Sequence, residues 1–313
     1  MNRLVLVMQF PTPMRYQSWW FTEFPREMRQ YFDQVIVLGK DYIESLNKIE
    51  KGNIENFSPV RSAIKFEMVQ IEEYLDIIQD DDYLFIADIS FPGLFINTLY
   101  HKRPFKCFSY CHAGAKNSFD YFSNSKDSKF QVESGHSKLF EAIFVGSKYH
   151  QNKLGWTNTL VTGLPHPPVL KPQNLERNKD IVSVCRPSIQ KVNKRTEKFV
   201  RQNFGEIIRG EFRTWENYSY FLSSSKILLI SSKEDTFNYT ILDAIECGCI
   251  PIAPNALCFP EILPEEYLYT NKEHLREIIQ NILDGKLGVP EILCKELVDD
   301  FYENITDIML ENL

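Results

Sequence analysis

Two aspartates that lie eight residues apart are the first side chains in this sequence that could do chemistry. Asp235 lies in a polar turn after an apolar run of strand length, Lys226–Ser231, and Asp243 lies in a stretch of helical spacing that begins near Asn238. Eight residues are slightly more than two helical turns, so both carboxylates could face one side and accept hydrogen bonds from sugar hydroxyls. The free N–H groups at such a helix start also suit an anionic or hydroxyl-rich ligand. The alternative interpretation is an ordinary strand–turn–helix with a capping aspartate.

Two cations follow a second apolar run, Ile181–Cys185. Arg186 and Lys191 would stand at the carboxyl end of that strand, where they could neutralise the charge that develops on a pyrophosphate leaving group without a metal ion. The pattern gains specificity because it occurs in order with the two aspartates. Lys194 is the alternative second cation, and solvated charges at a helix start are the alternative interpretation.

Three of the six histidines follow strand-like runs or lie among prolines. His112 comes soon after Phe105–Tyr110, where it could donate a hydrogen bond to a sugar hydroxyl or shuttle a proton, and a purely structural role stays open. His150 follows the run Ala142–Gly146 and is expected on a helix surface. His166 is flanked by prolines and is expected to shape a hinge rather than to act in catalysis.

Two further clusters have competing interpretations. Arg15, Gln17 and the pair Trp19–Trp20 could form an acceptor platform, since an aromatic face stacks on a sugar or a base, but the tryptophans could equally open an amphipathic helix and lie in the core. Asp80–Asp82 resembles a metal-binding D-x-D only superficially, because it precedes a strand, and we expect a solvated loop. The seven cysteines show no zinc-finger spacing, so we expect buried thiols and no metal site.

The composition bounds the architecture. A chain of 313 residues with 43% hydrophobic and 25% charged residues is typical of two globular domains. No apolar run approaches the roughly 20 residues that span a bilayer, and prolines break the first residues too early for a secretory signal. We therefore expect a cytoplasmic protein without a membrane span. The net charge of −7 does not favour broad binding of polyanions, but it leaves room for a local basic patch.

Short apolar runs alternate with stretches of helical spacing, which predicts βαβ units and parallel sheets covered on both faces. A proline-rich break at Leu164–Pro168 predicts a first domain at 1–165, a linker at 166–179, a second α/β domain at 180–290 and a terminal helix at 291–313 that packs back toward the first domain. Because ligands bind at the carboxyl ends of the strands in such sheets, we expect the site in a central cleft between the domains. The expected strands are Leu4–Phe10, Gln34–Gly39, Tyr83–Asp88, Phe105–Tyr110, Ala142–Gly146, Thr159–Gly163, Ile181–Cys185, Lys226–Ser231 and Ile250–Ala253, and the expected helices include Trp19–Phe32, Val69–Gln79 and Phe91–His101.

The segment from Asp235 to Pro251 resembles glycosyltransferase family 4 and its retaining GT-B relatives, which carry E-G-F-G-x-x-x-x-E-A-x-A-x-G followed by P-V. An alignment on Ala244, Gly248 and Pro251 places Asp235 and Asp243 at the two glutamates. The resemblance implies the GT-B fold, in which two Rossmann-like parallel-sheet domains face a central cleft. It also implies that the N-terminal domain takes the acceptor and the C-terminal domain binds the nucleotide sugar.

The resemblance assigns the donor site residue by residue. Asp235 and the backbone of Thr236, Phe237 and Asn238 would hold the donor sugar, and Asp243 would bind the nucleotide ribose. Two departures alter the donor loop: aspartates replace both glutamates, and Thr236 and Asn238 replace both glycines. Because Thr does not readily adopt the backbone angles open to glycine, we expect a loop of different shape.

The family's G-R-x-x-x-x-K implies that Arg186 and Lys191 clamp the donor's diphosphate. Similar enzymes often place a histidine near the donor sugar and the acceptor, as His112 would be. The resemblance thus assigns catalysis to His112, Arg186, Lys191 and Asp235.

The segment Pro254–Tyr269, together with the strand end at His112, resembles the tRNA-queuosine mannosyltransferase branch, whose acceptor is a hydroxyl of a modified nucleobase. A basic run could follow a phosphate backbone, or it could be one donor clamp plus a solvated helix. The members of this run are Arg186, Lys191, Lys194, Arg195, Lys198, Arg201, Arg209 and Arg213.

The sequence therefore predicts a retaining, metal-independent glycosyltransferase that needs no cofactor. It would move a hexose or pentose from a nucleotide-diphosphate sugar, such as UDP-glucose or GDP-mannose, to an acceptor hydroxyl. A modified nucleobase in tRNA or DNA is the leading acceptor, and cell-surface glycan or lipid precursors are the alternative. Two other classes stay open: a catalytically inactive nucleotide-binding scaffold or regulatory protein of the same fold, and a sugar-nucleotide epimerase.

Overall fold

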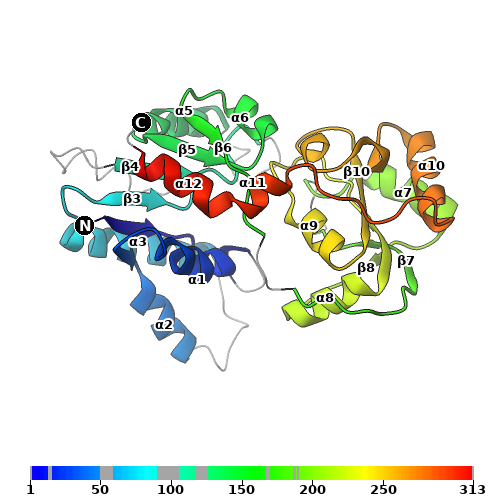
Figure 1. Cartoon of the computed structure of the whole chain (residues 1–313), viewed down its shortest axis with the longest axis horizontal. Coiled ribbons are helices and arrows are strands. Elements are labelled where there is room, and N and C mark those ends of the chain that lie inside the picture. The colour runs from blue at the N-terminus through cyan, green and yellow to red at the C-terminus, as the bar shows by residue number, and fades with distance from the viewer. Residues whose placement is uncertain are drawn as a thin grey trace.

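The computed structural model describes residues 2–12, 16–49, 59–89, 106–117, 126–166, 170–185, 188 and 190–311. The expected helix at Phe91–His101 lies outside these residues, as do Arg15 and Arg186. Within them, the chain forms two parallel β-sheets, one in each half, and helices connect and cover the strands (Figure 1). This arrangement confirms the predicted α/β class.

The N-terminal half is built on a six-stranded sheet with the order β2-β1-β3-β4-β5-β6. Aliphatic and aromatic runs fill most of its strands and are buried, as parallel strands between helices require. Its strands are β1 (Arg3–Val7), β2 (Gln34–Val37), β3 (Tyr83–Ile86), β4 (Lys106–Tyr110), β5 (Ala142–Val145) and β6 (Thr159–Val161). Its described helices are α1 (Tyr16–Met28), α2 (Lys40–Ile49), α3 (Pro59–Ile77), α5 (Lys126–Ser137) and α6 (Lys148–Leu154).

The C-terminal half is built on a five-stranded parallel sheet with the order β11-β10-β9-β7-β8. Its strands are β7 (Lys179–Ser183), β8 (Ile208–Arg209), β9 (Ser225–Leu229), β10 (Ile250–Pro254) and β11 (Leu268–Tyr269). Its helices are α7 (Lys194–Phe204), α8 (Trp215–Ser223), α9 (Tyr239–Glu246) and α10 (Lys272–Leu283). The two edge strands, β8 and β11, have two residues each and were not expected, because so short a run carries no readable pattern.

Both sheets place their first strand between the second and the third. Thus β1 lies between β2 and β3, and β7 lies between β8 and β9. The winding of the chain reverses at these points, and open α/β sheets bind ligands at the carboxyl ends of the strands there. In the N-terminal half, Gln9 and Asp88 follow β1 and β3, and Gln9 Nε2 donates to Asp88 Oδ2 at 2.5 Å. In the C-terminal half, Asp235 follows β9 at the corresponding place.

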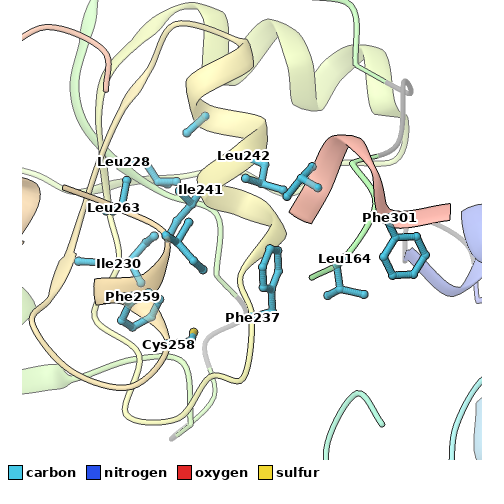
Figure 2. Close-up of a cluster of buried hydrophobic side chains, with 14 of the residues drawn as sticks. Leu164, Leu228, Ile230, Phe237, Ile241, Leu242, Cys258, Phe259, Leu263 and Phe301 are labelled. Atoms are coloured by element: carbon cyan, nitrogen blue, oxygen red, sulfur yellow. The ribbon is translucent and has the colours of Figure 1, made fainter. Parts of the chain in front are cut away.

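One cluster of buried apolar side chains extends through both halves of the molecule. Figure 2 shows a part of this cluster, in which Phe237 lies at the edge that faces Leu164 and Phe301. At Gly146, a Cβ atom would lie 2.9 Å from the Cβ of Phe237, closer than real Cβ contacts allow. The two halves therefore pack closely against each other at Gly146 and Phe237.

The end of the chain returns to the N-terminal half as two short helices, α11 (Lys295–Asp299) and α12 (Phe301–Leu310) (Figure 1). The ring of Phe301 lies 5.8 Å from that of Trp20, and the ring of Tyr302 lies 5.9 Å from that of Phe24. The single helix expected over 291–313 is thus shorter and interrupted at Asp300, which caps both pieces.

Two expectations about exposure are wrong. His150 is only 1% exposed, because α6 packs against the sheet and brings its ring within 3.9 Å of Cys111 Sγ. Asp82 is buried, because its carboxylate forms an ion pair with Arg3 at 2.7 Å at the start of β1. The tryptophan question is also answered: Trp19 and Trp20 are both buried in the core, which leaves no tryptophan platform.

Candidate active site at the junction of the two halves

Asp235 and Lys191 meet at the carboxyl end of the C-terminal sheet. Lys191 Nζ lies 2.7 Å from Asp235 Oδ1, and Asn238 Nδ2 donates to the other carboxylate oxygen at 2.8 Å. Asn238 in turn caps α9, since its side-chain oxygen accepts from the backbone N–H of Thr240 at 3.0 Å. The local sequence thus fixes the loop at both ends. The result is a buried carboxylate beside a partly exposed ammonium group.

The loop after Asp235 is also attached to the N-terminal half. Thr236 Oγ1 donates to the backbone carbonyl of His112 at 2.7 Å, and Ser147 Oγ donates to the carbonyl of Thr236 at 2.6 Å. Phe237 packs against Gly146 in the same place. Residues 235–238 therefore touch the ends of β4 and β5, so the expected sites of donor and acceptor lie next to each other.

His112 lies at this junction with its ring between two aromatic side chains. The ring centroid is 4.9 Å from that of Trp20 and 4.5 Å from that of Tyr110. Burial lowers the pKa of His112 to about 4, although a hydrogen bond to the backbone of Ala87 acts in the opposite direction. The imidazole is therefore neutral at pH 7. It can donate or accept a hydrogen bond, but it is a poor proton shuttle at neutral pH.

Asp243 lies in α9 and is fully buried. Three described side chains contact its carboxylate: the Tyr16 hydroxyl, the Tyr218 hydroxyl at 2.8 Å and His166 Nε2 at 3.2 Å. Asp235 precedes the helix, so the argument from helical spacing is wrong for this pair. The two carboxylates have separate sets of partners, and ribose binding by Asp243 stays a prediction.

His166 contacts the donor helix as well as shaping the linker. Its Nδ1 lies 3.0 Å from Glu246 Oε2, while its Nε2 faces Asp243. Tyr16, Tyr218 and Glu246 are neighbours of the site that were not predicted. No local pattern indicates the two tyrosines, because Tyr16 lies 227 residues and Tyr218 25 residues from Asp243 along the chain.

Two further polar contacts join the halves and were also missed. The carboxylate of Glu261 accepts from the backbone N–H groups of Lys148 and Tyr149, each at 2.7 Å, at the start of α6. Lys153, at the other end of α6, pairs with the buried Glu234 at 2.7 Å. Helix α6 is thus held at both ends by the C-terminal half.

A pocket of about 740 Å³ lies at the start of α7. Of the side chains that the structure describes there, four are cationic and one, that of Glu197, is a carboxylate. Glu197 is buried and pairs with Arg209, which also donates to the Cys185 carbonyl at 3.2 Å. Among the described residues, the lining consists of Ser188, Val192, Asn193, Lys194, Arg195, Glu197, Arg209 and Lys233.

Neither a cluster of metal ligands nor a membrane-spanning helix is found in the part of the chain that the structure describes. Within it, no three or more His, Cys, Asp and Glu side chains gather so that they could hold a metal ion. None of its helices combines the length and the apolar character that crossing a membrane requires.

Sequence comparison gives a partial match. The chain matches no family model. Over 136 residues, or 41% of this chain, it is 32% identical to the tRNA-queuosine alpha-mannosyltransferase of Drosophila melanogaster. The match bears out the resemblance to that branch, but it spans only 33% of the relative's length.

Solved structures match nearly the whole chain. The apo form of the lipopolysaccharide outer core galactosyltransferase WaaB has a TM-score of 0.63 at 11% identity, with 100% of both chains covered. A trehalose-6-phosphate protein from E. coli, bound with UDP-2-fluoro glucose, has a TM-score of 0.57 at 11% identity and covers 99% of this chain and 100% of its own. At this identity the likeness concerns the fold alone. Together with the two parallel sheets, it shows that the chain has the GT-B fold.

Proposed function

We propose that the protein is a glycosyltransferase that moves a sugar from a nucleotide-diphosphate donor to an acceptor hydroxyl. The observation that carries the proposal is the Lys191–Asp235 pair, which lies at the end of the C-terminal sheet where such sheets bind ligands. Asp235 is followed directly by Thr236, which donates a hydrogen bond to the His112 carbonyl. A cation for the leaving phosphate and a carboxylate for sugar hydroxyls are therefore adjacent. The UDP-sugar held by the E. coli structure of the same fold supports a nucleotide-sugar donor.

In the proposed reaction, the bond between the anomeric carbon and the diphosphate oxygen breaks as the acceptor oxygen bonds to the same face of that carbon. Attack on the same face retains the configuration of the anomeric carbon. The acceptor proton passes to the departing phosphate oxygen. Lys191, with Arg186, neutralises the charge that develops on the diphosphate. Asp235 and the backbone of 236–238 orient the sugar, and Asp243 takes the ribose.

His112 has a more limited role in this proposal than proton transfer. Its neutral ring orients a sugar or acceptor hydroxyl by a hydrogen bond, since its lowered pKa leaves no proton to donate as an acid at pH 7. Proton transfer falls to the departing phosphate instead.

For the acceptor, we propose a phosphate-bearing molecule, with a modified nucleobase in a nucleic acid as the leading case. The basic pocket at α7 supports this choice, because its four cations face a single carboxylate in a chain of net charge −7. The partial match to a protein named for tRNA-queuosine mannosylation is the second support.

The test is donor turnover. Wild-type protein incubated with UDP- and GDP-sugars should release the nucleotide, slowly without acceptor and faster with one. We expect Lys191→Met and Asp235→Asn each to reduce turnover by about 100-fold, since each removes a charge that acts on the transition state. Lys286→Met is the matched control, because Lys286 is exposed and pairs only locally with Asp284. Equal turnover in all four proteins would remove the site assignment.

A second function, a nucleotide-binding protein without transferase activity, is favoured by one observation. Asp243 is fully buried and already has three partners, so the expected ribose ligand is occupied. Calorimetry distinguishes the two functions: nucleotide binding without turnover of any donor, across a broad panel of acceptors, would favour the non-catalytic protein.

A further inference from the structure

The environment of Asp243 presents a problem for any nucleotide that would use it. A carboxylate has about four lone-pair sites, and three described side chains already contact this one. A fully buried carboxylate needs such partners, since leaving it unsatisfied would cost the full desolvation penalty. One site is left, so a ribose diol that donates two hydrogen bonds can bind Asp243 only if it replaces an existing partner.

The three partners are not equally placed to leave. Tyr218 lies in α8 of the C-terminal half and is itself buried, and His166 lies in the linker with its other ring nitrogen on Glu246. Tyr16 instead reaches across from the first turn of α1 in the N-terminal half, and it keeps partial exposure. It is thus the one contact among the three that belongs to the opposite half of the molecule.

Tyr16 also lies in an aromatic stack at the junction. Its ring stacks on Tyr239 with the centroids 3.9 Å apart, and it meets Trp215 at 5.5 Å. Tyr239 in turn accepts a hydrogen bond from Trp20 Nε1 at 3.1 Å. Departure of the Tyr16 hydroxyl would therefore disturb contacts between α1, α8 and α9 together.

We infer that the Tyr16 hydroxyl and the ribose diol of the nucleotide donor are alternative hydrogen-bond partners of Asp243. The inference rests on the proposed function. In the ligand-free protein, Tyr16 satisfies the buried carboxylate and connects the two halves. The donor must break this bond, so its apparent affinity is lower than that of a site already open. Tyr16 is a positioning residue, because it acts through Asp243 and not on the reacting atoms.

The test is the affinity of UDP and GDP, measured by calorimetry, for the wild type and for Tyr16→Phe. The variant keeps the stacked ring and loses only the competing hydroxyl. We expect it to bind the preferred nucleotide about tenfold more tightly, the factor that corresponds to one hydrogen bond to a charged group. The matched control is Tyr218→Phe, which removes a hydroxyl from the same carboxylate on the side that stays in place. We expect no tightening in that variant.

A nucleotide without the diol sharpens the comparison. The 2′,3′-dideoxy analogue cannot replace Tyr16 at Asp243, so Tyr16→Phe should leave its affinity unchanged. Unchanged or weaker binding of the normal nucleotide by Tyr16→Phe would overturn the inference, as would equal tightening for the analogue.

Hydrogen exchange of the wild type gives a measurement that does not need the variant to fold. The normal nucleotide, and not its dideoxy analogue, should increase exchange in the first turn of α1, and no increase would also overturn the inference. Failure of the proposed function looks different: either no variant binds a nucleotide, or nucleotides bind but no donor is turned over, whatever Tyr16→Phe does to their affinity.

Discussion

Thr236 shows how one hydroxyl accounts for a departure in the donor loop. Glycine in this place would serve a backbone with positive φ, but among the described residues Leu257 is the sole non-glycine with positive φ. Asn238 has φ of −133°, an ordinary value for the residue before a helix. The Thr236 hydroxyl instead bonds to the His112 carbonyl of the opposite half. The loop is thus shaped for side-chain contacts, as the sequence predicted in outline.

A prediction at this scale concerns the effect of His112 on the stability of the protein at acidic pH. Its pKa in the folded protein is about 4, below the ordinary value of 6.5, because the ring is buried. Between these pH values the unfolded chain binds more protons, so the free energy of unfolding falls as the pH drops from about 6.5 to 4. The loss should be about 2 kcal/mol, reduced from the full value by the ring's partial exposure.

Denaturant unfolding at several pH values measures this loss. His112→Asn should flatten the pH dependence by about that amount, whereas His274→Asn, at a partly exposed position of α10, should keep it. The same pH dependence in both variants would contradict the assignment. Part of the slope should persist in His112→Asn, because burial also lowers the pKa of His150, to about 3.

At the scale of elements, the strands were the most predictable part of the chain. Nine expected runs match β1 to β7, β9 and β10 within a few residues, because strands buried on both faces read as short apolar runs. The two-residue strands β8 and β11 have no such pattern. Local patterns also placed Lys191 and Asp235 after their strands, where the two meet.

Contacts between distant segments could not be predicted in this way. The partners of Asp243 come from α1, α8 and the linker, and the Glu261 contact with α6 joins residues 113 apart. Such contacts depend on how the two halves pack, and a single sequence does not encode that packing in any local spacing. The exposure errors at His150 and Asp82 also come from contacts between distant segments, in these two cases within the N-terminal half.

The Glu261 contact gives a prediction about how helix α6 is held. Its carboxylate satisfies two N–H groups that the first turn of α6 leaves free, in a position where a negative charge also meets the positive end of the helix. Glu261→Ala should lower the free energy of unfolding by about 1–2 kcal/mol. Glu265→Ala, an exposed neighbour, should change it by less than about 0.5 kcal/mol. Thermal and denaturant unfolding measure both variants. If Glu261→Ala lowers the free energy of unfolding no more than Glu265→Ala does, the contact contributes nothing to stability.

At the scale of the whole molecule, charge is distributed unevenly. The chain carries a net charge of −7, yet the described lining of the pocket at α7 has four cations and one carboxylate. The Arg209–Glu197 pair fixes the inner wall, and Lys194 and Arg195 are exposed at the rim. A nucleic-acid acceptor would therefore meet favourable potential in one place, next to the donor cation Lys191 in the sequence.

This distribution makes salt dependence the decisive measurement for the acceptor. Binding of a labelled single-stranded RNA, followed by anisotropy between about 50 and 200 mM salt, should weaken steeply because bound counterions are released from the phosphates. Lys194→Glu combined with Arg195→Glu should reduce the slope of log affinity against log salt by about 1.4, or about 0.7 for each cation lost, while donor hydrolysis without acceptor stays unchanged. Lys286→Glu combined with Lys138→Glu makes the same change in charge at two exposed residues that do not line the pocket. If the slope falls by the same amount in both double variants, binding follows net charge alone and the pocket is not the acceptor site. If the wild type does not bind the RNA at low salt, the acceptor is not a nucleic acid.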